Sequence, residues 1–247
     1  MSAYFPIPPN IFIEDHSCKI YGSLTFLNIP SNRLKNSIFD KKYNSIIYLG
    51  LYYLDEGNWI LIKTIECNPY EFVEVQRKNL KVHDNQMLLL VPQITNNFPA
   101  QTKELPKPYR LRLDKSPIAQ RGSLNFNFEK SVTSYQGEYP YKMASLKKGS
   151  FFSFDGLKQI SKNENLINFI IFMNININSE SQEKVTIKVF NPNNKEHKKN
   201  IIAQKNSFTI YRIENENISD LKNKILFYTS NNSSFIPISL TVNFQTN

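Results

Sequence analysis

Cysteine is nearly absent from this chain, which has only Cys18 and Cys67 among 247 residues. Two cysteines cannot build a dense disulfide framework, and their spacing is not that of a zinc site. Both lie among strand-like residues, so a single disulfide would require their strands to be neighbours. Two reduced, buried thiols that behave as small hydrophobic side chains are the favoured interpretation.

Histidine and glycine are also scarce. The three histidines, His16, His83 and His197, are far apart and do not have the pairwise spacing of metal ligands. With seven glycines the chain has no glycine-rich phosphate loop, and it contains no G-x-S-x-G nucleophile elbow. We therefore predict neither a metal site nor a cofactor.

Long hydrophobic runs are missing as well. The longest apolar runs, Met87 to Pro92 and Leu166 to Met173, are far shorter than the ~20 residues of a membrane-spanning helix. The first residues have neither a basic region nor a long apolar core, so no secretory signal is expected. We expect no membrane span and, by default, a cytoplasmic location, with assembly into a particle or non-classical export left open.

Aromatic and apolar residues are abundant. Eighteen Phe and thirteen Tyr, with 40% hydrophobic residues overall, can form a core without disulfides or metal. Leu124, Phe126 and Phe128 alternate with polar residues at period two, which is typical of a strand with one buried face. The chain repeats this pattern many times. It predicts an all-β, antiparallel sandwich or jelly roll, as two tandem sandwich domains with a few short helical turns.

The clearest local pattern lies between residues 46 and 75. A strand from Ile46 to Leu54 is followed by the turn Asp55 to Asn58, a return strand from Trp59 to Glu66, and a third strand from Phe72 to Val75. This order predicts a hairpin with a neighbouring strand. The first strand is apolar on both faces, so we expect it in the middle of a sheet.

Proline and basic residues accumulate in the centre of the chain. Five prolines between residues 92 and 121 disfavour a regular ladder and favour an extended linker. We predict a boundary there, with an N-terminal domain at 1–91, a linker at 92–121 and a C-terminal domain at 122–247. A long crossover within one sandwich is the alternative.

Most of the net charge of +9 comes from residues 76–121, which contain nine basic and three acidic side chains. Arg110, Arg112, Lys115 and Arg121 are the candidates for binding a polyanion. No basic helix, zinc module or single-strand-binding aromatic pattern accompanies them. A solvated basic surface is favoured, and nucleic acid is not a favoured partner.

The segment 134–143 is the candidate recognition site. It contains the aromatic and polar residues Tyr135, Gln136, Glu138, Tyr139 and Tyr141. Gly137 and Pro140 disrupt a regular strand, so we predict a shaped loop that carries the tyrosines. Aromatic rings beside amides suit a sugar. The same tyrosines would also suit a sandwich end or a subunit interface.

These observations favour a non-enzymatic binding or assembly module whose partner is another protein, further copies of the chain, or a glycan. One alternative is a carbohydrate-active enzyme that uses Glu138 and Asp155 as a carboxylate pair. That signal is weak, because ion pairing with nearby lysines is the simpler role for both acids. Binding of a polyanion by the basic segment 76–121 is the second alternative.

Overall fold

The computed structural model describes residues 3–28, 46–84, 86–109, 121–137, 139–140, 151–154, 165–175, 184–190, 197–213, 225–229 and 236–244. Regular structure in these ranges is β-strand, apart from the single-turn helices η1 (Glu14–His16) and η3 (Arg77–Asn79). Every strand pairing described is antiparallel. The predicted all-β antiparallel fold is confirmed. Contacts divide the chain into two units, Met1–Met143 and Ala144–Asn247.

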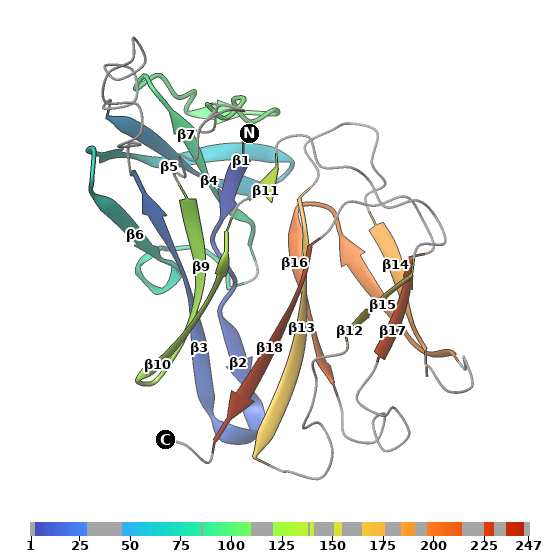
Figure 1. The fold of residues 1–247 in the computed structure, drawn as a ribbon. Coiled ribbons are helices and arrows are strands. Elements are labelled where there is room, and N and C mark those ends of the chain that lie inside the picture. Colours follow the sequence, from blue (N-terminus) through green and yellow to red (C-terminus); the bar gives the residue numbers. More distant parts are fainter. Residues whose placement is uncertain are drawn as a thin grey trace, which may run out of the picture. The chain divides into compact units, whose positions relative to one another are not determined.

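The first unit contains a six-stranded sheet (Figure 1). Its strand order is β11-β1-β7-β4-β5-β8. Strand β4 lies between β7 and β5, and Leu49, Leu51 and Tyr52 within it are fully buried. The central position predicted from the apolar run is therefore confirmed. The bounds are β1 Ala3–Pro6, β4 Ile47–Asp55, β5 Asn58–Cys67, β7 Leu88–Gln93, β8 Gln101–Thr102 and β11 Tyr139–Pro140.

The predicted hairpin is formed by β4 and β5. Its turn consists of Glu56 and Gly57, whose φ angles of 44° and 80° match the twist of a two-residue hairpin loop. The third strand, β6 (Phe72–Gln76), was expected beside this hairpin but pairs with β3 (Cys18–Leu27) in another sheet. Tyr70, with a φ of 67°, turns the chain away, and its N–H donates to the carbonyl of Asn28. The expected neighbour was therefore wrong.

The second sheet of this unit has five strands (Figure 1). Strand β3 has β9 (Arg121–Phe128) on one side, and β9 in turn pairs with β10 (Ser131–Gln136). On its other side β3 has two short partners in succession. Strand β2 (Ile11–Ile13) pairs with residues 18–20, and β6 pairs with residues 23–27. Residues 21 and 22 of β3 therefore lie between the two ladders.

The two sheets of the first unit share one core. The rings of Phe5 on β1 and Phe26 on β3 meet edge to face, with centroids 5.1 Å apart. A Cβ on Gly122 would overlap the ring of Phe5, so the glycine lets that ring approach β9. Leu124 and Phe126 are buried beside them, as the period-two alternation predicted. The arrangement is a sandwich of two sheets.

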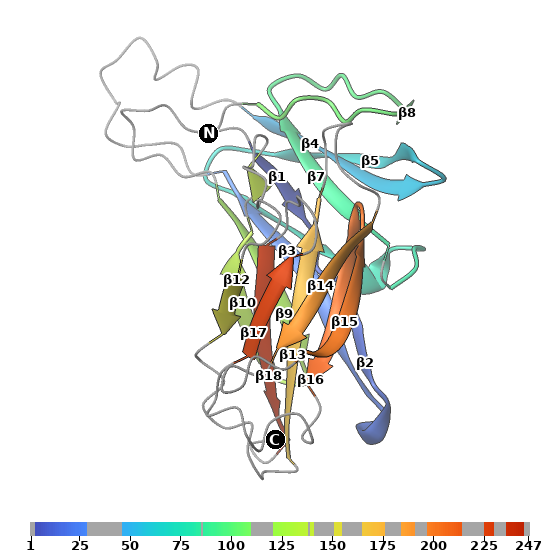
Figure 2. The ribbon, with the colours of Figure 1, turned by 90° about the vertical axis from the view of Figure 1, so that its right-hand side faces the viewer.

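The second unit also has two sheets. One has the order β12-β17-β14-β15, and Figure 2 shows β14 and β15 side by side. The other has the order β16-β13-β18, and all nine residues of its central strand β13 are buried. The bounds are β12 Phe151–Phe154, β13 Leu166–Asn174, β14 Lys184–Phe190, β15 His197–Gln204, β16 Ser207–Ile213, β17 Ile225–Thr229 and β18 Ile236–Asn243.

The predicted domain limits stay a prediction. Residues 110–120 of the predicted linker lie outside the described residues. Strand β9 pairs with β3, β10 pairs with β9, and β11 pairs with β1, so these ladders join residues after 120 to the first 27 residues. The grouping by contacts accordingly places all three strands in the first unit.

Gly22 generates the first testable prediction. A Cβ at this position would overlap the carbonyl oxygen of Pro8 and lie 2.8 Å from that of Pro9. Moving these backbone atoms out of the way would distort the chain, so we expect Gly22→Ala to lower the free energy of unfolding by about 2–4 kcal/mol. Urea denaturation measures this change.

Gly57→Ala is the matched control. Gly57 has a positive φ, but no atom lies within 4 Å of the position that a Cβ would take, so only about 1 kcal/mol of backbone strain is expected. A loss at Gly22 no larger than the loss at Gly57 would contradict the close approach of residues 8 and 9.

Cys67 generates a prediction about pH. Both cysteines are free thiols, and burial raises the pKa of Cys67 from 9.0 to about 11. Above pH 9 the unfolded thiol loses its proton while the folded thiol keeps it, so stability is lost as the pH rises towards 11. The urea midpoint should therefore fall less over this range in Cys67→Ala than in the wild type. If the urea midpoint fell equally with pH in the two proteins, the raised pKa of Cys67 would be refuted.

Candidate functional site

Two of the predicted ligand residues lie on strands rather than on a loop. Tyr135 is on β10 opposite Leu124, and its ring meets that of Phe126 edge to face at 6.1 Å. Tyr139 is on β11 opposite Tyr4 and is 1% exposed. Burial raises the pKa of the Tyr135 phenol. The predicted loop was wrong for these two residues. The hairpin turn at residues 129–130 continues β9 into β10, which contains Tyr135, and Tyr139 pairs with β1.

The other predicted site residues are placed only in part. Gln136 is exposed at the end of β10, opposite Ser123, and Arg121 begins β9 opposite Leu27. The remaining candidates lie outside the described residues, so the carboxylate pair and the polyanion set stay predictions. These candidates are Glu138, Tyr141, Asp155, Arg110, Arg112 and Lys115.

The five-stranded sheet turns one side towards the core of the first unit, and we call the opposite side the outer face. The strand register assigns alternate residues to the outer face, where Ser23 and Asn125 are buried and many of the others are partly or fully exposed. The outer face consists of Phe12 on β2, Lys19, Tyr21, Ser23, Thr25 and Leu27 on β3, Ser123, Asn125 and Asn127 on β9, Val132, Ser134 and Gln136 on β10, and Phe72, Glu74 and Gln76 on β6.

Asn125 organises the middle of the outer face. Its Nδ2 donates to Thr25 Oγ1 at 2.9 Å, which ties β9 to β3. Its Oδ1 accepts from Ser134 Oγ at 2.8 Å and from Ser123 Oγ at 3.1 Å. The hydroxyl groups are therefore held in fixed positions across three strands without any charged partner.

Asn127, two residues further along β9, forms a second row of hydrogen bonds between β9 and β3. Its Nδ2 donates to Ser23 Oγ at 3.0 Å and to the carbonyl oxygen of Tyr21 at 3.1 Å. Both asparagine side chains are thus oriented by neighbours in the adjacent strand, which reduces the entropy that a ligand would have to remove.

Exposed apolar side chains accumulate on the same face. Phe12 (59% exposed), Tyr21 (39%), Val132 (62%) and Phe72 (66%) all belong to it. They are four of the seven large exposed hydrophobic side chains in the part of the chain that the structure describes. Lys78 Nζ lies 5.6 Å from the ring centre of Tyr21. A concentration of this kind on one face marks a binding surface more often than scattered residues do.

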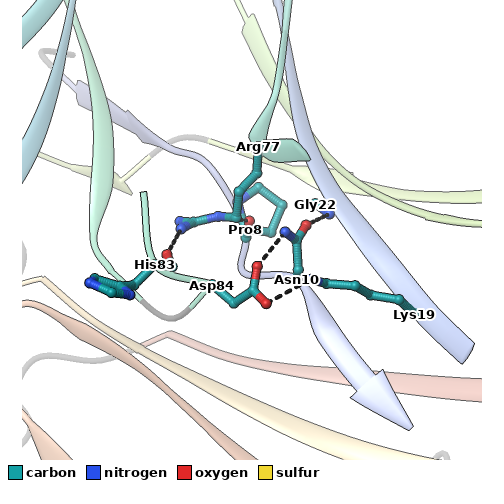
Figure 3. Close-up of polar contacts among 7 residues, drawn as sticks. All are labelled: Pro8, Asn10, Lys19, Gly22, Arg77, His83 and Asp84. Carbon is teal, nitrogen blue, oxygen red and sulfur yellow. Dashed lines mark hydrogen bonds and ion pairs between the residues drawn. The ribbon is translucent and has the colours of Figure 1, made fainter. Parts of the chain in front are cut away.

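A buried arginine holds the edge of this sheet together (Figure 3). Arg77 follows β6 and is 1% exposed. Its Nε donates to the Pro8 carbonyl at 2.8 Å, and its Nη2 donates to the Ile7 carbonyl at 3.0 Å. Two further carbonyls, those of His83 and Gln86, accept from Nη1 at 3.0 Å and Nη2 at 2.8 Å. Burial lowers the pKa of Arg77 to about 10, and Asp84 acts in the opposite direction.

Asp84 and Asn10 close the gap between β2 and β6 (Figure 3). Asn10 Oδ1 accepts from the Gly22 N–H at 3.0 Å, at the point where β3 has no strand partner on that side. Asp84 accepts from Asn10 Nδ2 and from Lys19 Nζ, each at 2.7 Å. Burial alone would raise the pKa of Asp84, but these hydrogen bonds and the charges of Lys19 and Arg77 leave it below its usual value.

The contacts of Arg77 join separate segments of the backbone. His83 contributes its backbone carbonyl to the cluster, and no nucleophile is paired with a base in the contacts of Figure 3. Across the described residues, no group of three or more His, Cys, Asp and Glu side chains is arranged to hold a metal ion. No helix there is long and apolar enough to cross a membrane.

Sequence reasoning found neither the outer face nor the role of Arg77. In the sequence Arg77 is only one charge of the basic segment, and its partners are backbone carbonyls that carry no sequence signal. The alternation on β9 did predict that Asn125 and Asn127 share a solvent side. The chain matches no protein-family model, no curated protein and no solved structure.

Substitution of Arg77 tests the role of this cluster. Arg77→Met leaves four carbonyls without their donor, and those of Ile7 and Pro8 are buried, so we expect a loss of about 3 kcal/mol in the free energy of unfolding. Arg77→Lys should recover only part of this loss, because an ammonium group lacks the planar fork of donors. Urea denaturation of both variants measures the effect.

Lys78→Met is the control, because Lys78 is the exposed neighbour of Arg77. Its stability should stay within about 0.5 kcal/mol of the wild type. If Arg77→Met were as stable as this control, the guanidinium would not be what holds residues 7 and 8 in place.

Proposed function

We propose that this protein is a non-enzymatic binding module and that its ligand lies on the outer face. The observation that carries the proposal is the combination, on one side of one sheet, of exposed aromatic rings and hydrogen-bonded neutral side chains. Phe12, Tyr21 and Phe72 supply the rings, and the exposed Ser134 and the partly exposed Asn127, beside the buried Asn125, supply the polar groups.

A glycan is the class of ligand that this chemistry fits best. A sugar ring has an apolar face that stacks on an aromatic side chain and hydroxyl groups that bond to amides and hydroxyls. Ser134 and Gln136 are exposed beside the asparagine rows and provide neutral groups of this type. Gln136 was also a candidate from sequence, and here it would act from a strand.

The spacing of the aromatic residues favours a chain of sugars over a single one. Phe72 is opposite Leu27, six residues from Tyr21 along β3. At ~3.3 Å per residue the two rings are separated by about 20 Å along the strand. A ligand that reaches both is longer than one sugar ring, so an oligosaccharide is the proposed ligand.

A protein partner on the same face is the second candidate. Phe72 and Phe12 are more than half exposed, and exposed aromatic rings of this kind are the usual anchors of a protein interface. The carboxylate-pair enzyme stays a hypothesis, since neither Glu138 nor Asp155 is among the described residues.

A glycan array followed by calorimetry with the best oligosaccharide tests the proposal. We expect Tyr21→Ala and Phe72→Ala each to weaken binding by about tenfold, which corresponds to the loss of one stacking contact. Ile202→Ala is the matched control, because Ile202 is exposed on β15 in the other unit and should leave the affinity unchanged.

Salt dependence separates this proposal from polyanion binding. A neutral oligosaccharide should bind with nearly the same affinity at low and high NaCl, whereas a polyanion held by the basic segment should dissociate as salt is added. A silent array would contradict the glycan. A protein ligand whose binding is lost in the same two variants would then support the second candidate.

A further inference from the structure

Strand β10 forms an open edge of the five-stranded sheet in the part of the chain that the structure describes. It pairs with β9 on one side and is the last strand in the order of that sheet. Its first four residues, Ser131 to Ser134, are all exposed. An exposed edge presents backbone N–H and C=O groups to which another strand can pair.

The composition of β10 sets it apart from the other described edge strands of five residues or more. Proteins commonly protect such edges with a charge or a proline. Each of the other edge strands has a charged residue or a proline: Glu74 on β6, Lys199 on β15, Arg212 on β16 and Pro237 on β18. Strand β10 reads SVTSYQ and has neither.

The hairpin geometry determines which backbone groups point outward. The turn between β9 and β10 has two residues, Glu129 and Lys130, and Phe128 pairs with Ser131 across it. In a two-residue hairpin this flanking pair is hydrogen-bonded, and hydrogen-bonded pairs then alternate along the ladder. Val132 and Ser134 therefore direct their N–H and C=O groups away from β9.

We propose that β10 pairs with β10 of a second copy of this chain, antiparallel, about a two-fold axis at Val132. An antiparallel edge rotated about such an axis presents C=O groups to N–H groups, so the interface is self-complementary. Val132, which is 62% exposed, then faces its own copy. Ser131 lies opposite Thr133, and Lys130 lies opposite Ser134, so no like charges face each other.

A second copy fits this edge better than a charged segment does. The middle of β10 offers no charge that would select an acidic or basic strand. Each copy has a net charge of +9, so two copies repel each other over long range at low salt. Dimerisation should therefore strengthen as NaCl is added, whereas binding of an acidic segment would weaken.

Sedimentation velocity across protein concentrations, at low and at high NaCl, tests the pairing. We expect the wild type to form a dimer, and Val132→Lys to weaken the dimer by at least about tenfold because two lysines then face each other at the axis. Ile202→Lys adds the same charge at an exposed site on β15 and should dimerise as the wild type does.

A cross-link gives a second measurement that does not depend on adding charge. In a hydrogen-bonded antiparallel pair the Cα atoms are ~5.5 Å apart, which suits a disulfide. Val132→Cys in a Cys18→Ser background should therefore form a covalent dimer on mild oxidation, with a 132–132 link seen by peptide mass spectrometry. Ile202→Cys in the same background should not.

Three results would overturn the proposal. These are a wild type that stays monomeric at every concentration and salt, a dimer that survives Val132→Lys unchanged, and a Val132→Cys variant that forms no 132–132 link. The glycan proposal has its own test in Tyr21→Ala and Phe72→Ala. Those two side chains lie on β3 and β6, whereas the proposed pairing is through β10, so the two proposals can fail separately.

Discussion

The hydrogen bonds from the Arg77 guanidinium to backbone carbonyls are the interaction on which the first unit depends. Strand β3 has two short partners on one side, β2 and β6, and nothing in the ladder itself joins them. Arg77 follows β6 and binds the carbonyls of Ile7 and Pro8 just before β2, so it fixes both partners at once. The cost of burying a cation is offset by four carbonyl dipoles and by the nearby carboxylate of Asp84.

The outer face depends on this junction. Phe12 and Phe72 come from β2 and β6, and they share a face only because both strands keep their register with β3. A shift of one residue in either ladder would turn its aromatic ring to the other side of the sheet. The proposed binding surface is therefore as well defined as the contacts of the arginine, although Arg77 itself is buried.

Local patterns in the sequence were sufficient for the strands but not for their partners. The alternation around Phe126 and the turn before Asn58 predicted β9 and the β4–β5 hairpin, because period and turn residues are local properties. Gly137 and Pro140 wrongly predicted a loop around Tyr135, although its own segment forms a strand. The hydrogen bonds of Arg77 to Pro8 and of Asn125 to Thr25 join residues 69 and 100 positions apart, and no local period records such pairings.

The two edges of the five-stranded sheet differ, and this difference limits how many copies of the chain can join through strand pairing. If β10 edges pair about a two-fold axis, each copy covers the open edge of the other, and the far margins of the joined sheet are β2 and β6. The first has only three residues and the second carries Glu74, so neither is a good template for a further strand. Such a sheet is complete at two copies and cannot extend into a fibre. The exposed edge of β10 would therefore not cause aggregation at high protein concentration.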